Sequence, residues 1–588
     1  MVLAPEHSAS SPELAIADWA IPNWRSAAAF RAKVLVHRLR RSIADTVGGP
    51  RRWDKEDRLV NSSVVGESHT KLWLDGRPEE HEYQLGKVQN LRRAAAALDG
   101  VVVPAGGVFS FWKQIGRASR RRGFVTGRML QQGCLVPATG GGLCQLSNAI
   151  YEAALTAGCE IVERHAHSRV VAGSAAAAGR DATVAWNYVD LRLRPRASMQ
   201  IEARLSRDEL IIRFRGRPGV AAPARVTQQQ APPAPEARSC ATCGEVACFR
   251  HEHPSPPVAT GRTAYLVDEN WPEFQDYVAK RHRREDVFGR PINGARWRLP
   301  RYAWQVEGFA RSGSAWGPAL GRMIAIRRAP AQGPARRQAE LNGAERIATR
   351  LARLLTPDVT RVCVAQSLLP YLWRDGHFGG REVEVLMTRL PLIELQARLD
   401  RAFAAHPERG TLADFRAPAV LVAAETKALA YATQIVTPHR EIARLFPEKA
   451  VILEWTLPAA RQAAGAAMQR IAFPGPTIAR KGAYDVRQAA KALGIEIVAL
   501  GSELEGPDFW GHIAMRKPTA GADWREGVAA VVQPAIVEER PRHLLAALAA
   551  GIPVVATTAC GLAEREGVTI IPPDDPEALL AALKLVLG

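Results

Sequence analysis

Short apolar runs separated by helix-like segments are the most constraining feature of this sequence, and they extend from about residue 259 to the C-terminus. Examples are VTRVCVA (359–365), APAVLVAAE (417–425), KAVILEW (449–455), GIEIVALG (494–501), VAAVVQP (528–534) and GIPVVATT (551–558). Such runs, alternating with helices, are typical of parallel strands that are covered on both faces. At about 330 residues the region is too long for one Rossmann unit and fits two.

The length of 588 residues allows about three or four compact domains. Hydrophobic residues make up 47% of the chain, so each domain can bury a core and a wholly disordered protein is excluded. We expect an α/β multidomain protein. Its expected parts are a basic extension (1–60), an α+β domain (61–217), a proline-rich linker (218–258) and two Rossmann-like, doubly wound domains (259–445 and 446–588).

The α+β domain is predicted from a change of hydrophobic period. The segments 85–100 and 140–158 have the helical period, and in the second a glycine turn leads into the helix. Alternating apolar and polar residues at 182–194 and 199–216 predict strands.

The chain carries 78 basic and 59 acidic residues, a formal charge of +19. This excess suggests an anionic partner such as a nucleotide, nucleic acid or acidic lipid, or else a compositional preference for arginine. Residues 25–42 predict a basic amphipathic helix with Phe30, Val34, Leu35 and Leu39 on one side. It is either a solvated surface helix or a peripheral contact with an anionic membrane.

No secretory signal and no uninterrupted apolar run of about 18 residues is visible in the sequence. The eight cysteines are scattered and do not form a disulfide framework. We therefore expect a cytoplasmic protein, with the membrane-peripheral contact as an option.

Cys144 follows three glycines directly and stands at the start of a predicted helix. A helix N-terminus lowers a thiol pKa and offers backbone N–H groups to an oxyanion. His165, His167 and Asp181 come downstream, so the segment holds the residue types of nucleophilic acyl transfer. The alternative is a buried, structural cysteine beside a glycine turn.

Five blocks of this region resemble the VanW family in order and spacing: PAGGVFSFWKQIG, RRGFVTGRML, GGGLCQLSN, ERHAHS and DATVAWNYVDLRLR. The resemblance, over about residues 80–217, implies a role in the bacterial cell envelope. Some VanW-domain proteins act as L,D-transpeptidases on peptidoglycan, and the resemblance makes Cys144 the nucleophile and His167 the base, with His165 as rival. Asp181 would orient the histidine or hold a turn. A domain that binds a peptide or glycan without cross-linking it is the other option.

Cys240, Cys243, Cys248 and His251, with His253 to spare, form a compact cluster in the linker. Thiolates and imidazoles at this spacing favour a structural zinc site; an iron–sulfur cluster or a metal-free loop are the alternatives. The spacing matches no nucleic-acid-reading finger, so we expect no nucleic-acid partner.

The C-terminal segment 534–588 reads as helix, buried strand PVVAT, and a loop that contains Gly561 and Glu564. Ends of parallel strands near helix N-termini are where such sheets bind phosphates. Together with the upstream block FPGPTIARKGAYDVRQAAKAL (473–493), the segment resembles the nucleotide-sugar domain of retaining glycosyltransferases with the GT-B fold. That resemblance makes Arg480 and Lys481 contacts of the donor diphosphate and places Glu538 nearby.

One position departs from that pattern, because the second of two expected glutamates falls on Ala546. In the acceptor-side domain, Glu425, His439, His377 and Arg381 are cleft candidates or satisfied structural residues. The sequence thus favours a protein of envelope biosynthesis whose glycosyltransferase half moves a sugar from a nucleotide-sugar onto an envelope glycan or peptide acceptor. The alternatives are cysteine-dependent acyl transfer by the VanW domain and a non-catalytic scaffold in which both sites are degenerate.

Overall fold

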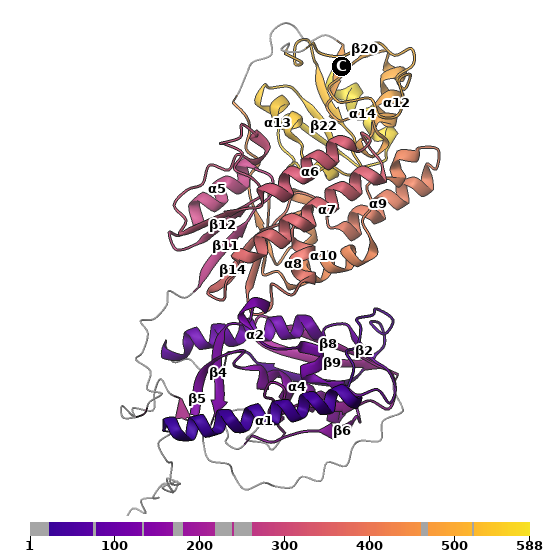
Figure 1. The fold of residues 1–588 in the computed structure, drawn as a ribbon. Coiled ribbons are helices and arrows are strands. Elements are labelled where there is room, and N and C mark those ends of the chain that lie inside the picture. The colour runs from indigo at the N-terminus through magenta and orange to yellow at the C-terminus, as the bar shows by residue number, and fades with distance from the viewer. Residues whose placement is uncertain are drawn as a thin grey trace, which may run out of the picture. The chain divides into compact units, whose positions relative to one another are not determined.

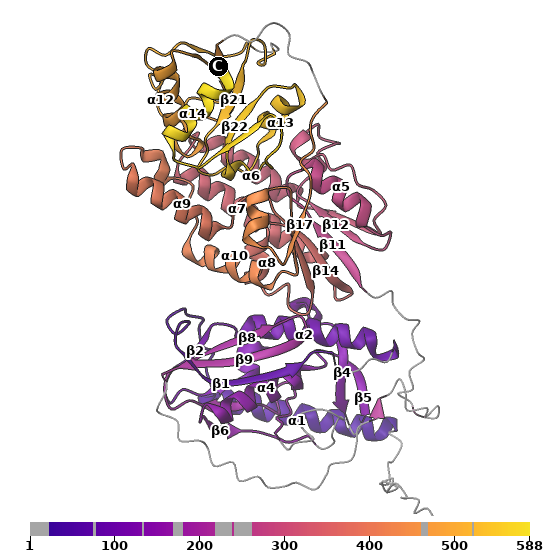
Figure 2. The same cartoon turned by 180° about the vertical axis from the view of Figure 1, so that it is seen from behind.

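A computed structural model describes residues 23–73, 78–131, 134–167, 180–217, 238–239, 248, 261–459, 469–519 and 523–588. The chain divides into two compact units, Met1–Val258 and Ala259–Gly588. Figures 1 and 2 show them from opposite sides, and each unit is described by itself.

Unit 1 is built on a four-stranded antiparallel sheet in the order β1-β9-β8-β2 (Ser63–Lys71, Glu209–Gly216, Met199–Leu205, Val101–Val103). Strands β8 and β9 confirm the strands predicted within 199–216. They form a hairpin, and every second residue of β9 is buried. Helices α2 (His81–Leu98) and α4 (Leu143–Thr156) pack on this sheet, so both predicted helices of the domain are present.

Two three-stranded sheets complete the strands of unit 1. One has the order β10-β5-β4 (Arg238–Ser239, Cys134–Thr139, Thr126–Gln131); the other has the order β3-β7-β6 (Phe109–Ser110, Arg192–Arg194, Glu160–Glu163), and the short α3 (Phe111–Ile115) follows β3. The strand predicted for 182–194 is wrong over most of its length: only Arg192–Arg194 is strand. The chain turns at Asn187, whose φ of 59° breaks an extended conformation.

Helix α1 (Trp24–Gly48) confirms the helix predicted for 25–42 but divides its apolar residues between two faces. Ala27 is buried, whereas Leu35 and Leu39 are exposed. The basic inner face is bound to the unit: Arg41 Nη1 donates to Glu163 Oε2 at 2.7 Å. Over the described residues, no helix is both long and apolar enough to cross a membrane.

Unit 2 contains two wholly parallel sheets, as the apolar runs predict. The first has the order β13-β12-β11-β14-β15-β16-β17 (Arg311–Ser314, Val287–Arg290, Arg262–Leu266, Val359–Ala365, Glu382–Leu386, Gln434–Thr437, Ala450–Ile452). The order reverses between β11 and β14, the arrangement of a Rossmann fold. This sheet continues to Ile452, beyond the predicted domain boundary after residue 445.

The second sheet has the order β20-β19-β18-β21-β22-β23 (Met515–Arg516, Glu496–Ala499, Arg470–Phe473, Ala530–Gln533, Val554–Thr557, Val568–Ile571). Its order reverses between β18 and β21 in the same way. Two Rossmann-like domains that share a pocket are the GT-B arrangement, so the predicted fold class is confirmed.

Helices cover both sheets, as Figure 2 shows from behind. They are α5 (Pro272–Arg281), α6 (Trp316–Arg328), α7 (Pro334–Leu351), α8 (Leu369–Arg374), α9 (Leu392–Ala405), α10 (Ala419–Tyr431), α11 (Arg440–Leu445), α12 (Ala483–Leu493), α13 (Arg542–Ala549) and α14 (Pro576–Leu587). The run 417–425, interpreted as a strand, is wrong, because it lies in α10. Its alanines and leucines continue into a helix-forming segment that starts after Pro418.

Ion pairs join the two halves of unit 2. Glu273 in α5 accepts two hydrogen bonds from Arg542 at the start of α13, at 2.9 and 2.7 Å. Arg409 Nη1 lies 3.4 Å from Asp485 Oδ1 in α12. These contacts fix the two Rossmann-like domains around the pocket described below.

Candidate functional site

The three glycines before Cys144 allow a turn that side chains would block. Gly140 and Gly142 have φ of 82° and 93°, a region that favours glycine. A Cβ on Gly141 would lie 2.3 Å from the backbone carbon of Gly127. The turn therefore packs against strand β4 and starts α4 at Gly142, which places Cys144 in its first turn.

His167 and Asp181 meet beside Cys144. The Nδ1 of His167 is hydrogen-bonded to Asp181 Oδ2, and the His167 backbone N–H donates to the same oxygen at 2.7 Å. The carboxylate is held in turn by Arg164, whose Nη2 donates to Asp181 Oδ1 at 2.9 Å. Cys144 Sγ lies 3.9 Å from Thr183 Oγ1 and from the backbone oxygen of Val184, and His167 is near enough to act on the thiol. The structure thus brings together the three residues that the sequence analysis named.

Cys144 and His167 shift each other's pKa. Burial alone would raise the pKa of the Cys144 thiol, but His167 outweighs burial and lowers that pKa. Burial alone would lower the pKa of His167, yet Asp181 and Cys144 raise it to about 9. A thiolate beside an imidazolium is the reactive form of a cysteine nucleophile.

The rival histidine and the other two cysteines of this region lie apart from that contact. His165 is more exposed and is paired with Glu163, its Nε2 3.3 Å from Oε1. Cys134 and Cys159 are buried, and burial raises the pKa of Cys159 to about 12. These two positions have the character of packing residues.

The predicted metal cluster lies almost wholly outside the described residues: Cys240, Cys243, His251 and His253 are not described. Cys248 is described, buried and a free thiol. In the part of the chain that the structure describes, no group of three or more His, Cys, Asp or Glu side chains is arranged to hold a metal ion. The zinc site stays a prediction.

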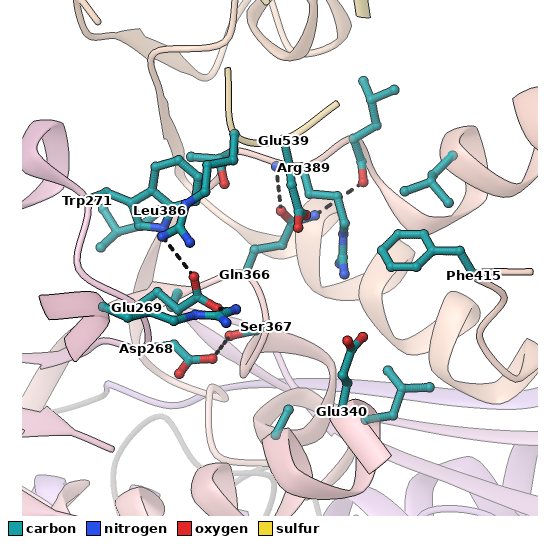
Figure 3. A pocket seen from close by; sticks show the side chains of 18 of the residues that line it. Asp268, Glu269, Trp271, Glu340, Gln366, Ser367, Leu386, Arg389, Phe415 and Glu539 are labelled. Atoms are coloured by element: carbon teal, nitrogen blue, oxygen red, sulfur yellow. Dashed lines mark hydrogen bonds and ion pairs between the residues drawn. The ribbon is translucent and has the colours of Figure 1, made fainter. Parts of the chain in front are cut away.

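Unit 2 holds a pocket of about 440 Å³ at the carboxyl ends of its strands. Residues from the loops after β11, β14 and β15 line it from the first sheet, and those after β18 and β21 line it from the second. Both points where the strand order reverses therefore open into the same cavity, which is where sheets of this kind bind ligands. Figure 3 shows Asp268, Glu269, Ser367, Phe415 and Glu539 around it.

Arg480, Lys481 and Glu538 line this pocket. Lys481 Nζ lies 2.9 Å from Glu538 Oε2. Burial alone would raise the pKa of Glu538, but the charge of Lys481 outweighs it and lowers that pKa. Within the described residues, the Arg480 guanidinium has no ion-pair or hydrogen-bond partner, and it lies 5.0 Å from the centre of the Phe415 ring.

A glycine after Lys481 explains how these cations reach the pocket. Gly482 has φ of 81° and starts α12, and a Cβ there would lie 2.2 Å from the carbonyl oxygen of Pro534. The close approach sets the short helix that carries Arg480 and Lys481 against the loop that carries Glu538. The motif is thus a backbone requirement as well as a source of charge.

The other two predicted donor residues lie away from this pocket. Gly561 is packed against His439, and a Cβ on it would meet that imidazole at 2.3 Å. Glu564 is exposed. Neither is among the residues that line the pocket.

The sequence analysis missed the acceptor-side residues. Asp268, directly after β11, forms two hydrogen bonds with Arg322 at 2.9 and 2.6 Å, and Ser367 Oγ donates to Asp268 Oδ2 at 2.8 Å (Figure 3). Burial alone would raise the pKa of Asp268, but Arg322 outweighs it and lowers that pKa. Their positions at strand ends were the available indication, since such loops line the sites of parallel sheets.

Of the cleft candidates, Glu425 is buried and accepts a hydrogen bond of 2.6 Å from Arg389, a pocket residue. His439 is buried against Gly561, and burial lowers its pKa. Arg381 is fully buried and donates to backbone carbonyl oxygens such as that of Val359. The last two therefore have structural roles.

Family models match two parts of the chain. Residues 86–215 match VanW like protein, and residues 496–588 match Glycosyl transferases group 1. The first match lies in unit 1 and contains Cys144, His167 and Asp181. The second lies in unit 2 and contains Glu538 but begins after Arg480 and Lys481.

Two curated relatives match unit 1. Uncharacterized protein YoaR of Bacillus subtilis (strain 168) is 35% identical over 118 residues, which are 20% of this chain and 38% of that protein. Vancomycin B-type resistance protein VanW of Enterococcus faecalis (strain ATCC 700802 / V583) is 34% identical over 117 residues, 19% of this chain and 42% of that protein. The chain thus spans less than half the length of each relative.

Several solved structures are similar to this chain over about half of its length. Sucrose-phosphate synthase from Thermosynechococcus elongatus has a TM-score of 0.35 at 12% identity and covers 55% of this chain and 90% of its own. The calicheamicin glycosyltransferase CalG4 has a TM-score of 0.30 at 12% identity and covers 56% and 91%. Anabaena HepE, solved in complex with UDP, has a TM-score of 0.34 at 12% identity and covers 55% and 90%.

Proposed function

Because the chain carries a VanW domain and a C-terminal group 1 glycosyltransferase domain, we propose that it is a glycosyltransferase of bacterial cell-envelope biosynthesis. In this reaction the bond between the sugar's anomeric carbon and the donor phosphate breaks, and a bond to an acceptor oxygen forms. The acceptor loses a proton, and the nucleoside diphosphate leaves. The anomeric configuration is retained, and the acceptor is an envelope glycan or peptide.

The observation that carries this proposal is the placement of Arg480 at the reversal point of the second sheet. A half-buried guanidinium that has no ion-pair partner among the described residues, next to the Lys481–Glu538 pair, suits the two negative charges of a departing diphosphate. Burial lowers the pKa of Arg480, so an anionic ligand would stabilise its charged form.

Nucleotide binding tests the proposal. A panel of nucleotide-sugars and nucleoside diphosphates is titrated into the full chain by calorimetry. We expect one nucleotide to bind and Arg480→Gln to weaken it about 10- to 100-fold, the effect of losing one charge-assisted hydrogen bond. Lys491→Gln, an exposed change at the other end of α12, is the matched control. A panel without any binding would contradict the proposal.

A second activity is favoured by the contact of Cys144, His167 and Asp181 in unit 1. We propose that the thiolate attacks a peptide carbonyl carbon, that His167 protonates the departing amine, and that a second amine later releases the acyl group from sulfur. A non-catalytic role in binding a peptide or glycan is the alternative. The test is covalent capture: a thiol-reactive acyl analogue should label Cys144 in the wild type and in His165→Ala, but not in His167→Ala.

The proposal places the protein in the cytoplasm at an anionic membrane surface. All six described cysteines are free, which suits a reducing compartment. The outer face of α1 exposes a helical row, Leu35, Leu39, Ile43 and Val47, opposite its buried face, and the exposed Arg31 and Arg40 lie next to the row, one turn before Leu35 and Ile43. An apolar row flanked by cations is the pattern of a helix that lies on acidic lipid.

A further inference from the structure

Two guanidinium groups approach one aromatic ring on the acceptor side of the pocket. The guanidinium carbon of Arg337 in α7 lies 4.2 Å from the centre of the Phe415 ring, and that of Arg480 lies 5.0 Å from it. Phe415 has φ of 64°, a conformation unusual for a residue other than glycine. The ring faces the cavity in Figure 3.

Arg337 keeps one edge of its guanidinium unpaired although its side chain is nine-tenths buried. Its Nη1 donates to Glu340 Oε2 at 3.1 Å, whereas Nε and Nη2 are buried and have no hydrogen-bond partner among the residues that the structure describes. These two nitrogens form the edge that donates two parallel hydrogen bonds to one carboxylate or phosphate. A buried donor without a partner is destabilising, so this edge is poised for a ligand oxygen.

Arg389 adds a second charge to the same wall. Arg389 follows β15, and its Nη2 donates a hydrogen bond to Glu425. Its Nε is also buried and has no hydrogen-bond partner among the described residues. Burial and the charge of Arg389 lower the pKa of Arg337, which shows that the two cations repel each other.

The residues that line the pocket carry more positive than negative charges. Eight of its residues are Arg or Lys and five are Asp or Glu. Two of the acidic residues are already paired with other cations of the lining: Asp268 with Arg322, and Glu538 with Lys481. An added anion would therefore lower the electrostatic energy of the Arg337–Arg389 wall.

We propose that Arg337 and Arg389 bind an oxyanion group of the acceptor, a phosphate or a carboxylate. This inference rests on the proposed glycosyl transfer and adds the acceptor's chemical class to it. Both arginines belong to the first Rossmann-like domain, whereas Arg480 and Lys481, which face the donor diphosphate, belong to the second. Glu340, half-buried, is bonded to Nη1 of Arg337 and so leaves the Nε–Nη2 edge to the ligand.

The test uses the full chain saturated with the nucleoside diphosphate that binds most tightly, so that the donor subsite is filled. Methyl phosphate and acetate are then titrated separately by calorimetry. We expect an anion to bind and Arg337→Lys, which keeps the charge but removes the fork, to weaken it at least tenfold. Arg389→Gln should act in the same direction. The nucleotide affinity of Arg337→Lys should stay within twofold of wild type.

Arg350→Gln, an exposed change in the last turn of α7, is the matched control and should bind the anion as wild type does. The stronger of the two probes identifies the group as phosphate or carboxylate. Equal anion affinity in Arg337→Lys and wild type, or no anion binding at all, overturns the inference while donor binding stands. If no nucleotide binds, the donor proposal fails, and the same titration on the nucleotide-free chain still decides whether Arg337 holds an anion.

Discussion

His167 is hydrogen-bonded to Asp181 twice, through the Nδ1 of its imidazole and through its own backbone N–H. The carboxylate therefore fixes the ring's position as well as its tautomer, and the other ring nitrogen is left for Cys144. Since Arg164 holds Asp181 from the opposite oxygen, the whole arrangement is set before any substrate arrives.

Cys144 should react with iodoacetamide at pH 6.5, where an ordinary thiol is nearly inert. His167, with a pKa of about 9, is positively charged at pH 6.5 and lowers the pKa of the Cys144 thiol, so the thiolate fraction of Cys144 is larger than that of an ordinary thiol. Asp181→Asn should slow the alkylation about tenfold at this pH, because it removes the charge that stabilises the imidazolium.

Mass spectrometry of the labelled peptide measures this rate. Cys159, buried and with a raised pKa, supplies the internal control and should stay unlabelled in the folded protein. Equal rates for Asp181→Asn and wild type at pH 6.5 would show that Asp181 only holds a turn.

Asp485 should make unit 2 less stable as the pH rises from 4 to 6. Burial raises its pKa to about 6 although Arg409 opposes the shift. A folded-state pKa above the ordinary value contributes stability that is complete below about pH 4 and is lost as the pH rises through 6. In Asp485→Asn this pH dependence should disappear. Urea unfolding at pH 4, 5 and 6 checks it, and parallel curves for both proteins would refute it.

Gly482→Ala should cost more stability than Gly494→Ala, although both glycines have positive φ, of 81° and 63°. The backbone term, about 1–2 kcal/mol, applies to both. Only at Gly482 would the new Cβ meet Pro534 O, at 2.2 Å, whereas nothing lies within 4 Å at Gly494. We expect an extra 1–3 kcal/mol from that overlap, roughly.

Thermal unfolding measures the stability of the two variants, and nucleotide titration measures the affinity of the pocket in each of them. The Gly482 variant should also bind nucleotide less well, because Lys481 precedes the displaced backbone. Similar losses in both variants would mean that the loop at Pro534 yields easily.

Helix α1 should bind vesicles that contain acidic phospholipid and not neutral ones. Ile43→Asp places a charge in the exposed apolar row and should lower the bound fraction several-fold in a sedimentation assay. Ala44→Asp adds the same charge on the neighbouring exposed position outside the row and should have a smaller effect. Equal binding of the two variants would argue for charge attraction alone.

The sequence predicted those features that depend on neighbouring residues in the chain. The glycines before Cys144 and after Lys481 were found because a turn needs them wherever it lies in the fold. The run 417–425 was misassigned because apolar runs of that length suit a strand or a buried helix equally. Arg337 and Arg389 were missed because they lie 52 positions apart in the sequence and come together only in the folded pocket.

Each sheet of unit 2 brings its own reversal point to the shared cavity. In the proposed reaction, the residues that bind the leaving nucleotide and those that bind the acceptor therefore belong to separate segments of the chain, and each segment folds around its own strands. A donor-side half from one such enzyme could be recombined with an acceptor-side half from another, and selection could alter one preference while the other stays constant.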